Sequence, residues 1–280
     1  MSSIQRDLIF DAGLYTGEDT AYYLKRGFRV VGIDANPQLI ENARSKFKTQ
    51  LRNRKLILLN YALSERDNQI VSFYLCNNPA LSSLKRSMTV RGHWCNAGSV
   101  TVETRKLSTL IEEYGLPYYC KIDVEGYDEV CLKTLAELDY CPPWISTEAE
   151  SSESLESSDT EALGTLHLLT KLGYRKFKLV DQATLTVLDP GVKFYMNTCG
   201  RLSFFKENWA KVHRGILRRY LLSRFGFGFP LGASGSFGDE LSSEWLDYES
   251  AKATLLYHRR DYFKSTPKHL GLWCDWHATF

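Results

Sequence analysis

The chain has 280 residues, of which 44% are hydrophobic, 24% are charged and 13% are aromatic. This composition can bury a core, and it excludes collagen-like, disulfide-scaffold, membrane-spanning and wholly disordered proteins. Thirty-five Lys and Arg residues against 33 Asp and Glu residues give a formal net charge of +2, which argues against a basic field for nucleic acid over the whole surface.

The first sixty residues alternate between expected strands and expected helices. Apolar runs predict three strands, at 8–10, 29–33 and 55–59. Helices are expected between them, over 18–26 and over 37–51, because apolar residues recur there at helical spacing. This alternation is typical of an α/β sheet with parallel strands.

After residue 60 the pattern becomes less regular. Further strands are predicted at 69–75, 99–106, 118–123, 144–148 and 174–180. Further helices are predicted at 108–114 with Ser108 as the cap, at 127–138, at 160–172 after a Ser158 or Asp159 cap, at 209–225 and at 245–262. The polar stretch Asn77–Gly98 is long for a connection inside a compact domain, and we expect it to form a lid or one wall of a site.

Two segments compete for the last strand of the sheet, 192–198 and 272–280. We expect an α/β core over 1–183 and an insertion or C-terminal elaboration over 184–280. The first seven residues contain no apolar signal-peptide core, and the seven cysteines form no CxxC pair, which favours reduced thiols. We therefore expect a cytoplasmic protein.

The first strand-to-helix turn and the end of the second strand carry the residues of a nucleoside site. Asp11, Gly13 and Gly17 follow the first apolar run, and glycine lets the backbone approach a ligand closely. Asp34 ends the second strand, where an acidic side chain can accept hydrogen bonds from two ribose hydroxyls. In the competing interpretation, Asp11 and Asp34 only cap the helices that follow them. The pair at this spacing favours the nucleoside site.

The segment K-I-D-V-E-G at 121–126 places three charged residues at the end of a predicted central strand. A central parallel strand is normally apolar, so charges there are costly unless they lie at the carboxyl end, where open α/β sheets bind ligands. A buried ion pair between Lys121 and a carboxylate, serving structure alone, is the alternative.

Four segments together resemble the FkbM family of S-adenosylmethionine-dependent methyltransferases. They are D-A-G at 11–13, G-I-D-A-N-P at 32–37, N-Y-A-L-S at 60–64 and K-I-D-V-E-G at 121–126, with Asp128 two residues further on. The resemblance covers roughly residues 7 to 182. It implies a class I methyltransferase fold, a Rossmann-like and mostly parallel α/β sheet of seven strands with the last antiparallel. It also implies O-methylation of a hydroxyl on a sugar, glycan or natural product.

The resemblance implies that the cofactor is S-adenosylmethionine, and it assigns a group of residues to each part of this molecule. The amino acid end of the donor is assigned to Asp11, Gly13 and Gly17 with Thr20 beside them, the ribose to Asp34, the adenosine to Ala35 and Asn36, and the adenine to Tyr61 and Ala62. Asp123 is expected where the donor ammonium meets the acceptor.

The catalytic residues are expected in the segment 121–126. The protein must align the hydroxyl, the methyl carbon and the sulfur, and a base near the hydroxyl helps to remove its proton. Glu125 is the leading candidate for that base, and Asp123 is expected to combine donor binding with catalysis. Lys121 is expected to tune either carboxylate, because clustered carboxylates with one Lys have pKa values that are pushed apart.

No metal is predicted. Oxygen ligands suited to Mg²⁺ or Ca²⁺ lie at predicted strand ends, in Asp123, Glu125, Glu148 and Glu150, but nothing in their spacing is specific for a metal. The expected partner is a small-molecule or glycan acceptor. The net charge argues against nucleic acid, no membrane span is expected, and the oligomeric state stays open.

Two alternatives remain beside O-methylation of a small acceptor. The basic stretch 201–224 would suit an RNA 2′-hydroxyl methyltransferase. A non-catalytic protein with a methyltransferase fold could instead bind a nucleoside, or bind a partner through the acidic stretch 148–161. Measuring first the binding of the methyl donor and then its turnover would distinguish an enzyme from a non-catalytic binding protein. His277 is more readily explained as a core or surface residue than as a functional one.

Overall fold

The computed structural model describes residues 3–90, 96–149, 158–182, 185–188, 215–216, 219–220, 222–230, 233–265 and 273–280. The chain forms two compact units, Met1–Ile145 and Ser146–Phe280. The expected core over 1–183 and elaboration over 184–280 stay predictions, since most of the residues from 183 to 232 lie outside the described ones. Among the described residues, no helix combines the length and the apolar character that crossing a bilayer requires.

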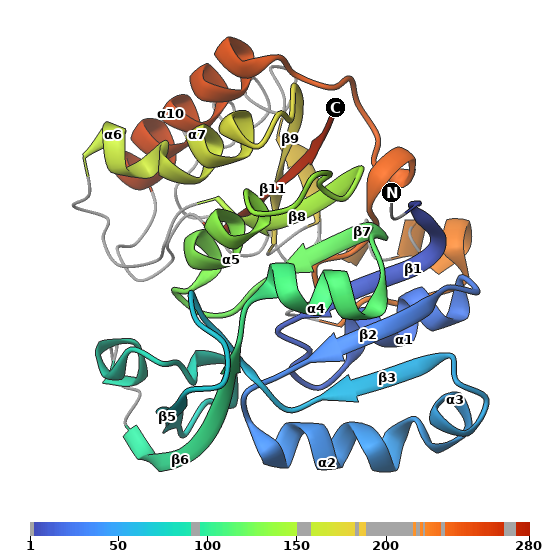
Figure 1. The fold of residues 1–280 in the computed structure, drawn as a ribbon. Coiled ribbons are helices and arrows are strands. Elements are labelled where there is room, and N and C mark those ends of the chain that lie inside the picture. Colours follow the sequence, from blue (N-terminus) through green and yellow to red (C-terminus); the bar gives the residue numbers. More distant parts are fainter. Residues whose placement is uncertain are drawn as a thin grey trace. The chain divides into compact units, whose positions relative to one another are not determined.

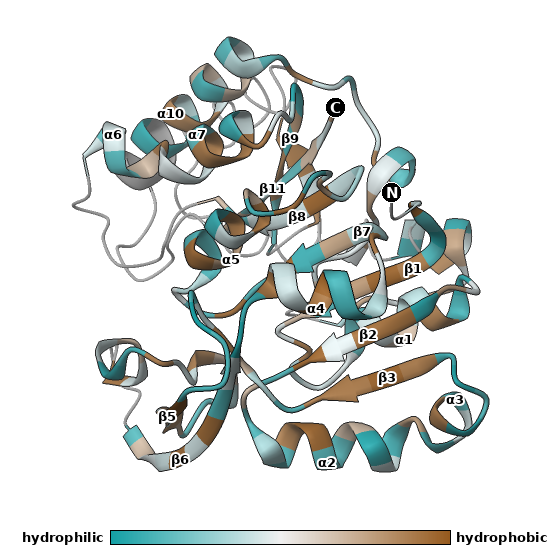
Figure 2. Cartoon of the chain, in the orientation of Figure 1, coloured by the Kyte–Doolittle hydropathy of each residue, from teal (hydrophilic) through white to brown (hydrophobic). Residues whose placement is uncertain are grey.

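The main sheet of the first unit is parallel. Its strands are β1 (Gln5–Ala12), β2 (Arg29–Ile33), β3 (Leu56–Leu59) and β7 (Pro117–Ile122), in the order β7-β1-β2-β3. Their arrowheads point to one edge (Figure 1), and β1 and β3 are hydrophobic along most of their length (Figure 2). This is the run of apolar strands that a sheet covered on both faces requires.

Helices connect these strands. They are α1 (Glu18–Lys25), α2 (Pro37–Lys46), α3 (Lys48–Arg52), α4 (Leu107–Tyr114) and α5 (Asp128–Leu135). The single helix expected over 37–51 is wrong, because Phe47 leaves the helical conformation (φ −110°, ψ 30°) between α2 and α3. The Phe47 ring packs closely on Gly17, because a Cβ at Gly17 would come within 2.8 Å of it. The helix therefore breaks at a residue that packs against the turn before α1.

The cap expected at Ser108 is also wrong. The N-cap of α4 is Lys106, and the hydroxyl of Ser108 donates a hydrogen bond of 3.1 Å to the Glu137 carboxylate. A side-chain partner distant in sequence has replaced the local capping bond that the pattern predicted.

A second, small sheet lies beyond the arrowhead edge of the first unit (Figure 1). Its strands are β4 (Ala62–Leu63), β5 (Ile70–Cys76) and β6 (Asn96–Arg105), with β5 antiparallel to β6. The long connection between β5 and β6 contains two 3₁₀ turns, η1 (Pro79–Leu81) and η2 (Arg86–Val90). It is therefore partly regular, although residues 91–95 lie outside the described ones.

The second unit contains antiparallel pairings. Strand β8 (Trp144–Glu148) begins in the first unit and ends in the second, which continues with α6 (Asp159–Ala162), α7 (Gly164–Lys171), β9 (Lys176–Asp181), β10 (Thr186–Leu188), η4 (Gly238–Glu240), α10 (Tyr248–Ser265) and β11 (Cys274–Thr279). Strand β11 runs antiparallel to β9, and so does β10. Ser158 caps α6: its hydroxyl oxygen accepts a hydrogen bond from the Glu161 amide, and the Glu161 carboxylate accepts one from the Ser158 amide.

The expected fold class is confirmed, including the antiparallel last strand, which the structure places at β11. The competing segment 192–198 lies outside the described residues. The number of strands differs from the expected seven. Among the described residues, the main-sheet strands of the two units number eight, because β10, which the sequence pattern did not predict, pairs with β9.

Candidate functional site

Asp11 is the most buried charged residue at the strand ends of the first unit. The register of β1 places it beside Lys121 on β7 and beside Gly32 on β2. Its side chain is fully buried, and the hydroxyl of Thr20 in α1 donates a hydrogen bond of 2.6 Å to its Oδ2. Asp11 therefore does not cap the next helix, whose N-cap is Gly17. It forms a buried contact between a strand end and the first turn of that helix.

Lys121 occupies the centre of a carboxylate cluster. Its side chain is only 4% exposed, and its Nζ lies near three carboxylate oxygens, at 3.4 Å (Asp11 Oδ1), 3.9 Å (Asp19 Oδ2) and 3.5 Å (Asp123 Oδ2). The same ammonium donates a hydrogen bond of 3.1 Å to the carbonyl oxygen of Gly13. Of these three carboxylates, Asp123 is the one that reaches the surface, with 32% of its side chain exposed.

Desolvation acts most strongly on the innermost carboxylate of the cluster. Burial raises the pKa of Asp11, and the attraction of Lys121 opposes that rise without cancelling it. Asp11 Oδ1 accepts no hydrogen bond from the described residues, and the ammonium of Lys121 lies 3.4 Å from it. Such an arrangement is costly unless a further cation or donor compensates it.

Gly13 allows the turn after β1 to lie directly against the end of β7. The residue has a φ of 86°, and a Cβ built on it would come within 1.7 Å of the Asp123 carbonyl oxygen. The amide of Asp123 donates to the Ala12 carbonyl, while the amide of Gly13 donates to the Ile33 carbonyl, both at 2.9 Å. The turn is thus held between β2 and β7, in a position that only glycine can occupy.

Asp34 joins two turns at the end of β2. Its carboxylate accepts a hydrogen bond from the Tyr15 amide at 2.9 Å and one from the Asn36 amide at 2.8 Å. Burial raises the pKa of Asp34 to about 6, although these two bonds oppose the rise. Two of roughly four acceptor positions on the carboxylate are used, which leaves room for further donors such as a pair of hydroxyls.

Asn60 supports the same strand end from β3. Its amide group donates to the carbonyl oxygens of Asp34 at 2.9 Å and of Ala35 at 3.1 Å. The Asn36 side chain accepts a bond from the Gln38 amide and caps α2. The ends of β2 and β3 are therefore tied together by side chains, which fixes the position of Asp34.

The residues assigned to the adenine lie next to the small sheet. Ala62 is buried in an apolar cluster with Phe73 and Val102, and Ala35 packs against that cluster. The guanidinium of Arg105 lies 5.4 Å from the centre of the Tyr61 ring. The side chain of Ala62 thus belongs to a core, whereas Tyr61 is half-buried.

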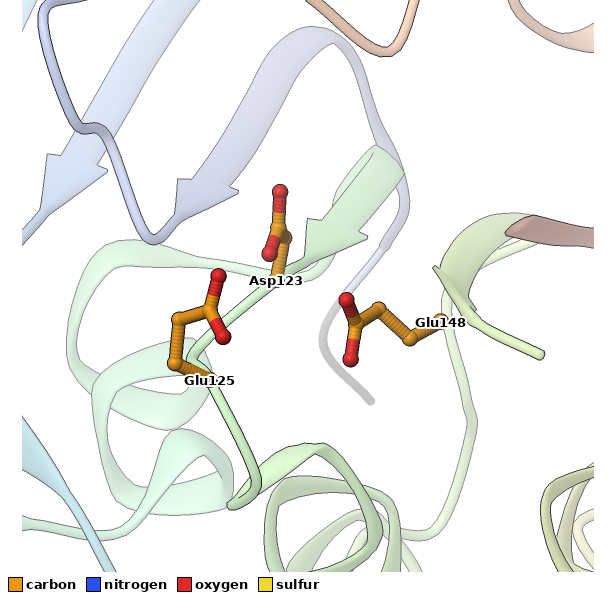
Figure 3. Close-up of side chains that lie close together, drawn as sticks. All are labelled: Asp123, Glu125 and Glu148. Carbon is orange, nitrogen blue, oxygen red and sulfur yellow. The ribbon is translucent and has the colours of Figure 1, made fainter. Parts of the chain in front are cut away.

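The turn after β7 has an unusual backbone. Glu125 has a φ of 43° and Gly126 a φ of 86°, and the left-handed region is disfavoured for a residue with a Cβ. Ser83 holds this turn, since its buried hydroxyl donates a bond of 2.7 Å to the Glu125 carbonyl. Asp128 holds it from the other side by accepting the Val124 amide at 3.3 Å. Figure 3 shows Asp123 and Glu125 projecting from this segment.

Asp128 is buried at the start of α5 and lies near Asp123. Burial raises the pKa of Asp128 to about 6, and the negative charge of Asp123 adds to the rise. The expectation that Lys121 pushes apart the pKa values of Asp123 and Glu125 is a different one and stays a prediction.

The four candidate metal ligands are distributed over both units. Asp123 and Glu125 belong to the first unit, whereas Glu148 ends β8 in the second unit and is also labelled in Figure 3. Glu150 lies outside the described residues.

Three residues of this region were not assigned a role from the sequence. Asp19 faces Lys121 from α1, Asn60 supports the end of β2, and Ser83 holds the turn at Glu125. A buried acidic residue in the first turn of an amphipathic helix is a usable signal for Asp19. The contacts of Ser83 and Asn60 join residues far apart in sequence, so no local pattern indicates them.

The comparisons with known proteins concern most of the first unit and the beginning of the second. The family model described as the methyltransferase FkbM domain matches residues 11–176, more than half of the 280 residues. Among solved structures, a methyltransferase FkbM from Methylobacillus flagellatus KT is 13% identical, with a TM-score of 0.40 over 64% of this chain and 41% of that one. A putative rRNA-methylase from Clostridium thermocellum is 14% identical, with a TM-score of 0.35 over 64% of this chain and 78% of that one.

None of the curated proteins compared with the chain matches it. The chain covers less than half of the Methylobacillus flagellatus protein. The family model nevertheless begins at Asp11, the buried carboxylate of β1, and continues past the turn that carries Asp123 and Glu125. Because this model spans both the strand ends and more than half of the sequence, the chain belongs to the methyltransferase FkbM domain family.

Proposed function

We propose that the first unit binds S-adenosylmethionine at the carboxyl ends of β1, β2 and β7 and transfers its methyl group to a hydroxyl. The acceptor class is a sugar, a glycan or a natural product. The observation that carries the proposal is the convergence of three carboxylates on one sheet edge, Asp11, Asp34 and Asp123, within a chain of the FkbM family. Open α/β sheets bind their ligands at this edge.

The residues at this edge fit the donor. The Asp34 carboxylate keeps acceptor positions for the two ribose hydroxyls while it holds two backbone amides. Asp11 Oδ1 accepts no hydrogen bond from the described residues, and an ammonium group would supply one. Gly13 lets the backbone come close, and the ring of the half-buried Tyr61 offers a flat surface for the adenine.

S-adenosylmethionine supplies an activated methyl group, whose carbon–sulfur bond breaks as the acceptor oxygen forms a carbon–oxygen bond. The protein contributes alignment and removes the proton that the hydroxyl loses. Glu125 receives that proton as a carboxylate, and Ser83 and Asp128 fix the turn on which it stands. The Lys121 ammonium lies within 3.5 Å of the carboxylates of Asp11 and Asp123 and holds both at the strand ends.

Two measurements test this function. Calorimetry with S-adenosylmethionine and S-adenosylhomocysteine should show binding to the purified chain, and Asp34→Ala should weaken both ligands about tenfold or more, because each carries the same ribose. Transfer of a labelled methyl group to a panel of sugars and glycans then identifies the acceptor class. Binding of neither ligand to the wild-type chain would refute the proposal.

The alternatives appear as other outcomes of the same assays. Methylation of an RNA oligonucleotide, without methylation of any sugar, would replace the acceptor class. Donor binding without turnover on any hydroxyl acceptor would favour the non-catalytic reading. Glu125→Gln is the informative variant here, since it should abolish turnover and leave donor binding unchanged.

A further inference from the structure

A guanidinium lies over the aromatic ring to which the proposed function assigns the adenine. The carbon of the Arg105 guanidinium is 5.4 Å from the centre of the Tyr61 ring. Strand pairing brings the two residues together, because Leu63 of β4, two residues after Tyr61, pairs with Arg105 at the end of β6. A cation over an aromatic face is attracted by the electrons of the ring. Arg105 therefore covers one face of Tyr61, and a planar ligand would stack on the other face.

Arg105 is itself held by two carboxylates. Its Nη2 donates a hydrogen bond of 2.8 Å to Glu113 in α4, and its Nε lies 3.4 Å from Oδ1 of Asp67. Only 16% of the arginine side chain is exposed. Because the guanidinium is planar and its donors have fixed directions, two partners determine its orientation as well as its position.

Asp67 is fixed in turn by the beginning of α4. Its carboxylate accepts a hydrogen bond of 2.7 Å from the Lys106 amide and one of 2.8 Å from the Thr109 hydroxyl. An ion pair between two long surface side chains contributes little, since both must be ordered to form it. The pair of Arg105 with Asp67 differs, because the carboxylate is already held by other bonds.

The backbone on both sides of Tyr61 is also fixed. The preceding residue, Asn60, donates to the carbonyl oxygens of Asp34 and Ala35 at 2.9 Å and 3.1 Å, and Asp34 is the residue proposed for the ribose. The following residue, Ala62, pairs with β6. With the backbone held in this way, the contact with Arg105 acts on the orientation of the Tyr61 ring.

We propose that Arg105 is a positioning residue that holds the Tyr61 ring for the adenine of S-adenosylmethionine. The inference rests on the proposed function, because it assumes that the donor binds at the strand ends with its adenine on Tyr61. A ring that is already held by a guanidinium loses little freedom when the adenine stacks on it, and such preorganisation strengthens binding. Asp67 and Glu113 then contribute to donor affinity through Arg105.

A double-mutant cycle with S-adenosylhomocysteine, which carries the same adenine, tests the inference by calorimetry. Tyr61→Leu should weaken binding about tenfold or more, because a stacked base loses its aromatic partner. Arg105→Met, which removes the charge and keeps an unbranched side chain, should weaken it about fivefold. The double variant should bind within about twofold of Tyr61→Leu, because Arg105 acts through the ring.

Two further measurements separate positioning from a general loss of structure. Adenosine lacks the amino acid end of the donor, and Arg105→Met should weaken it by the same factor as S-adenosylhomocysteine, since the effect lies in the nucleoside half. Arg105→Lys restores a cation, so it should recover part of the affinity that Arg105→Met loses.

Lys106→Met is the matched control. It removes the neighbouring cation, which pairs with Glu137, and it keeps the backbone amide that binds Asp67. We expect this variant to leave both affinities unchanged. Should Arg105→Met fail to fold, Glu113→Gln removes the charge of one partner of the guanidinium at an exposed side chain, and it should weaken S-adenosylhomocysteine about threefold.

Several results would overturn the inference while leaving donor binding intact. They are an Arg105→Met variant that binds as tightly as the wild-type chain, single losses that multiply in the double variant, an Arg105→Lys variant that recovers nothing, and an equal loss in Lys106→Met. Failure of the wild-type chain to bind either S-adenosylmethionine or S-adenosylhomocysteine would instead refute the proposed function, which keeps the two failures distinct.

Discussion

Each unit of this chain buries a lysine on a strand, and the two lysines are compensated in different ways. Lys121 lies one residue from the end of β7, among three carboxylates. Lys178 lies in the middle of β9, is 1% exposed, and donates a bond of 3.0 Å to the Leu241 carbonyl. Its ammonium also lies 4.3 Å from the centre of the Trp245 ring.

The difference separates a candidate site from ordinary packing. Burial lowers the pKa of Lys178 and the charge of Asp239 opposes that change, while a carbonyl and an aromatic face lie against its ammonium. The ammonium of Lys121 instead lies near three carboxylates, at the edge where parallel sheets bind ligands. A buried lysine is therefore more informative about function when it lies among carboxylates at a strand end than when it packs in the middle of a strand.

The largest difference between the two units is expected in the stability cost of replacing a glycine with positive φ, Gly13 in the first unit and Gly235 in the second. Gly13→Ala should cost more than about 3 kcal/mol of stability, because the new Cβ would collide with the backbone oxygen of Asp123 at 1.7 Å. Gly235→Ala in the second unit should cost only about 1 kcal/mol, since the nearest atom is the flexible end of Leu185 at 3.1 Å. Urea denaturation of both variants measures the difference, and equal costs would mean that the turn at Gly13 can relax.

The next largest difference is expected in the affinity for S-adenosylmethionine when each buried lysine site is altered by one substitution. Asp11→Asn should weaken S-adenosylmethionine binding by about 30-fold or more, because it removes a buried partner of Lys121 and the acceptor for the donor ammonium. Lys178→Met should leave that binding unchanged, since its contacts lie within the second unit. Calorimetry decides between them, and a comparable loss in Lys178→Met would erase the functional distinction between the two lysines.

Between pH 6.5 and pH 5, acid should have the smallest effects, and the stabilities of the two units should change in opposite directions. Burial lowers the pKa of His277 to about 3, with Lys178 contributing, so the folded state excludes a proton that the unfolded chain takes up below about pH 6.5. Stability from His277 therefore falls as the pH drops from about 6.5 toward 3, by at most about 1.4 kcal/mol per pH unit. The pKa of Asp34 is raised to about 6, so its contribution falls as the pH rises from about 4 to 6.

Hydrogen exchange at pH 6.5 and pH 5, corrected for intrinsic rates, resolves these opposite trends. Protection in β9 and β11 should decrease at the lower pH in the wild-type chain and remain constant in His277→Gln. Protection in β2 should increase at the lower pH, and Asp34→Asn should remove that increase. A uniform response of both units to acid would show that other groups dominate the titration.

Much of the first unit follows from local sequence. The strands at β1, β2, β3 and β7 were predicted from apolar runs, and the charged residues that end them were recognised because charges are costly elsewhere in a parallel strand. Asp11 and Lys121 meet because parallel register aligns the ends of β1 and β7. The roles assigned to these residues in donor binding and catalysis stay predictions.

Long-range contacts explain what the sequence did not predict. The helix break at Phe47 coincides with packing on Gly17, and the turn at Glu125 is held by Ser83, which is 42 positions away in sequence. The choice of β11 as the last strand depends on pairing with β9, and neither segment carries a local signal of that pairing. Such contacts depend on the assembled fold.

The pairing of β9 with β11 also determines how the second unit can be assembled. Asp181 pairs with Cys274, whereas in the first unit Leu8 pairs with Arg29, so the second pairing closes a far longer loop. Long-range pairings of this kind form slowly. Until β11 arrives, the backbone donors and acceptors on one side of β9 stay open to other chains, and an exposed strand edge invites aggregation. Changes that delay this step, or that remove 274–279, should therefore lower the yield of the protein through aggregation, even though they leave the strand ends of the first unit untouched.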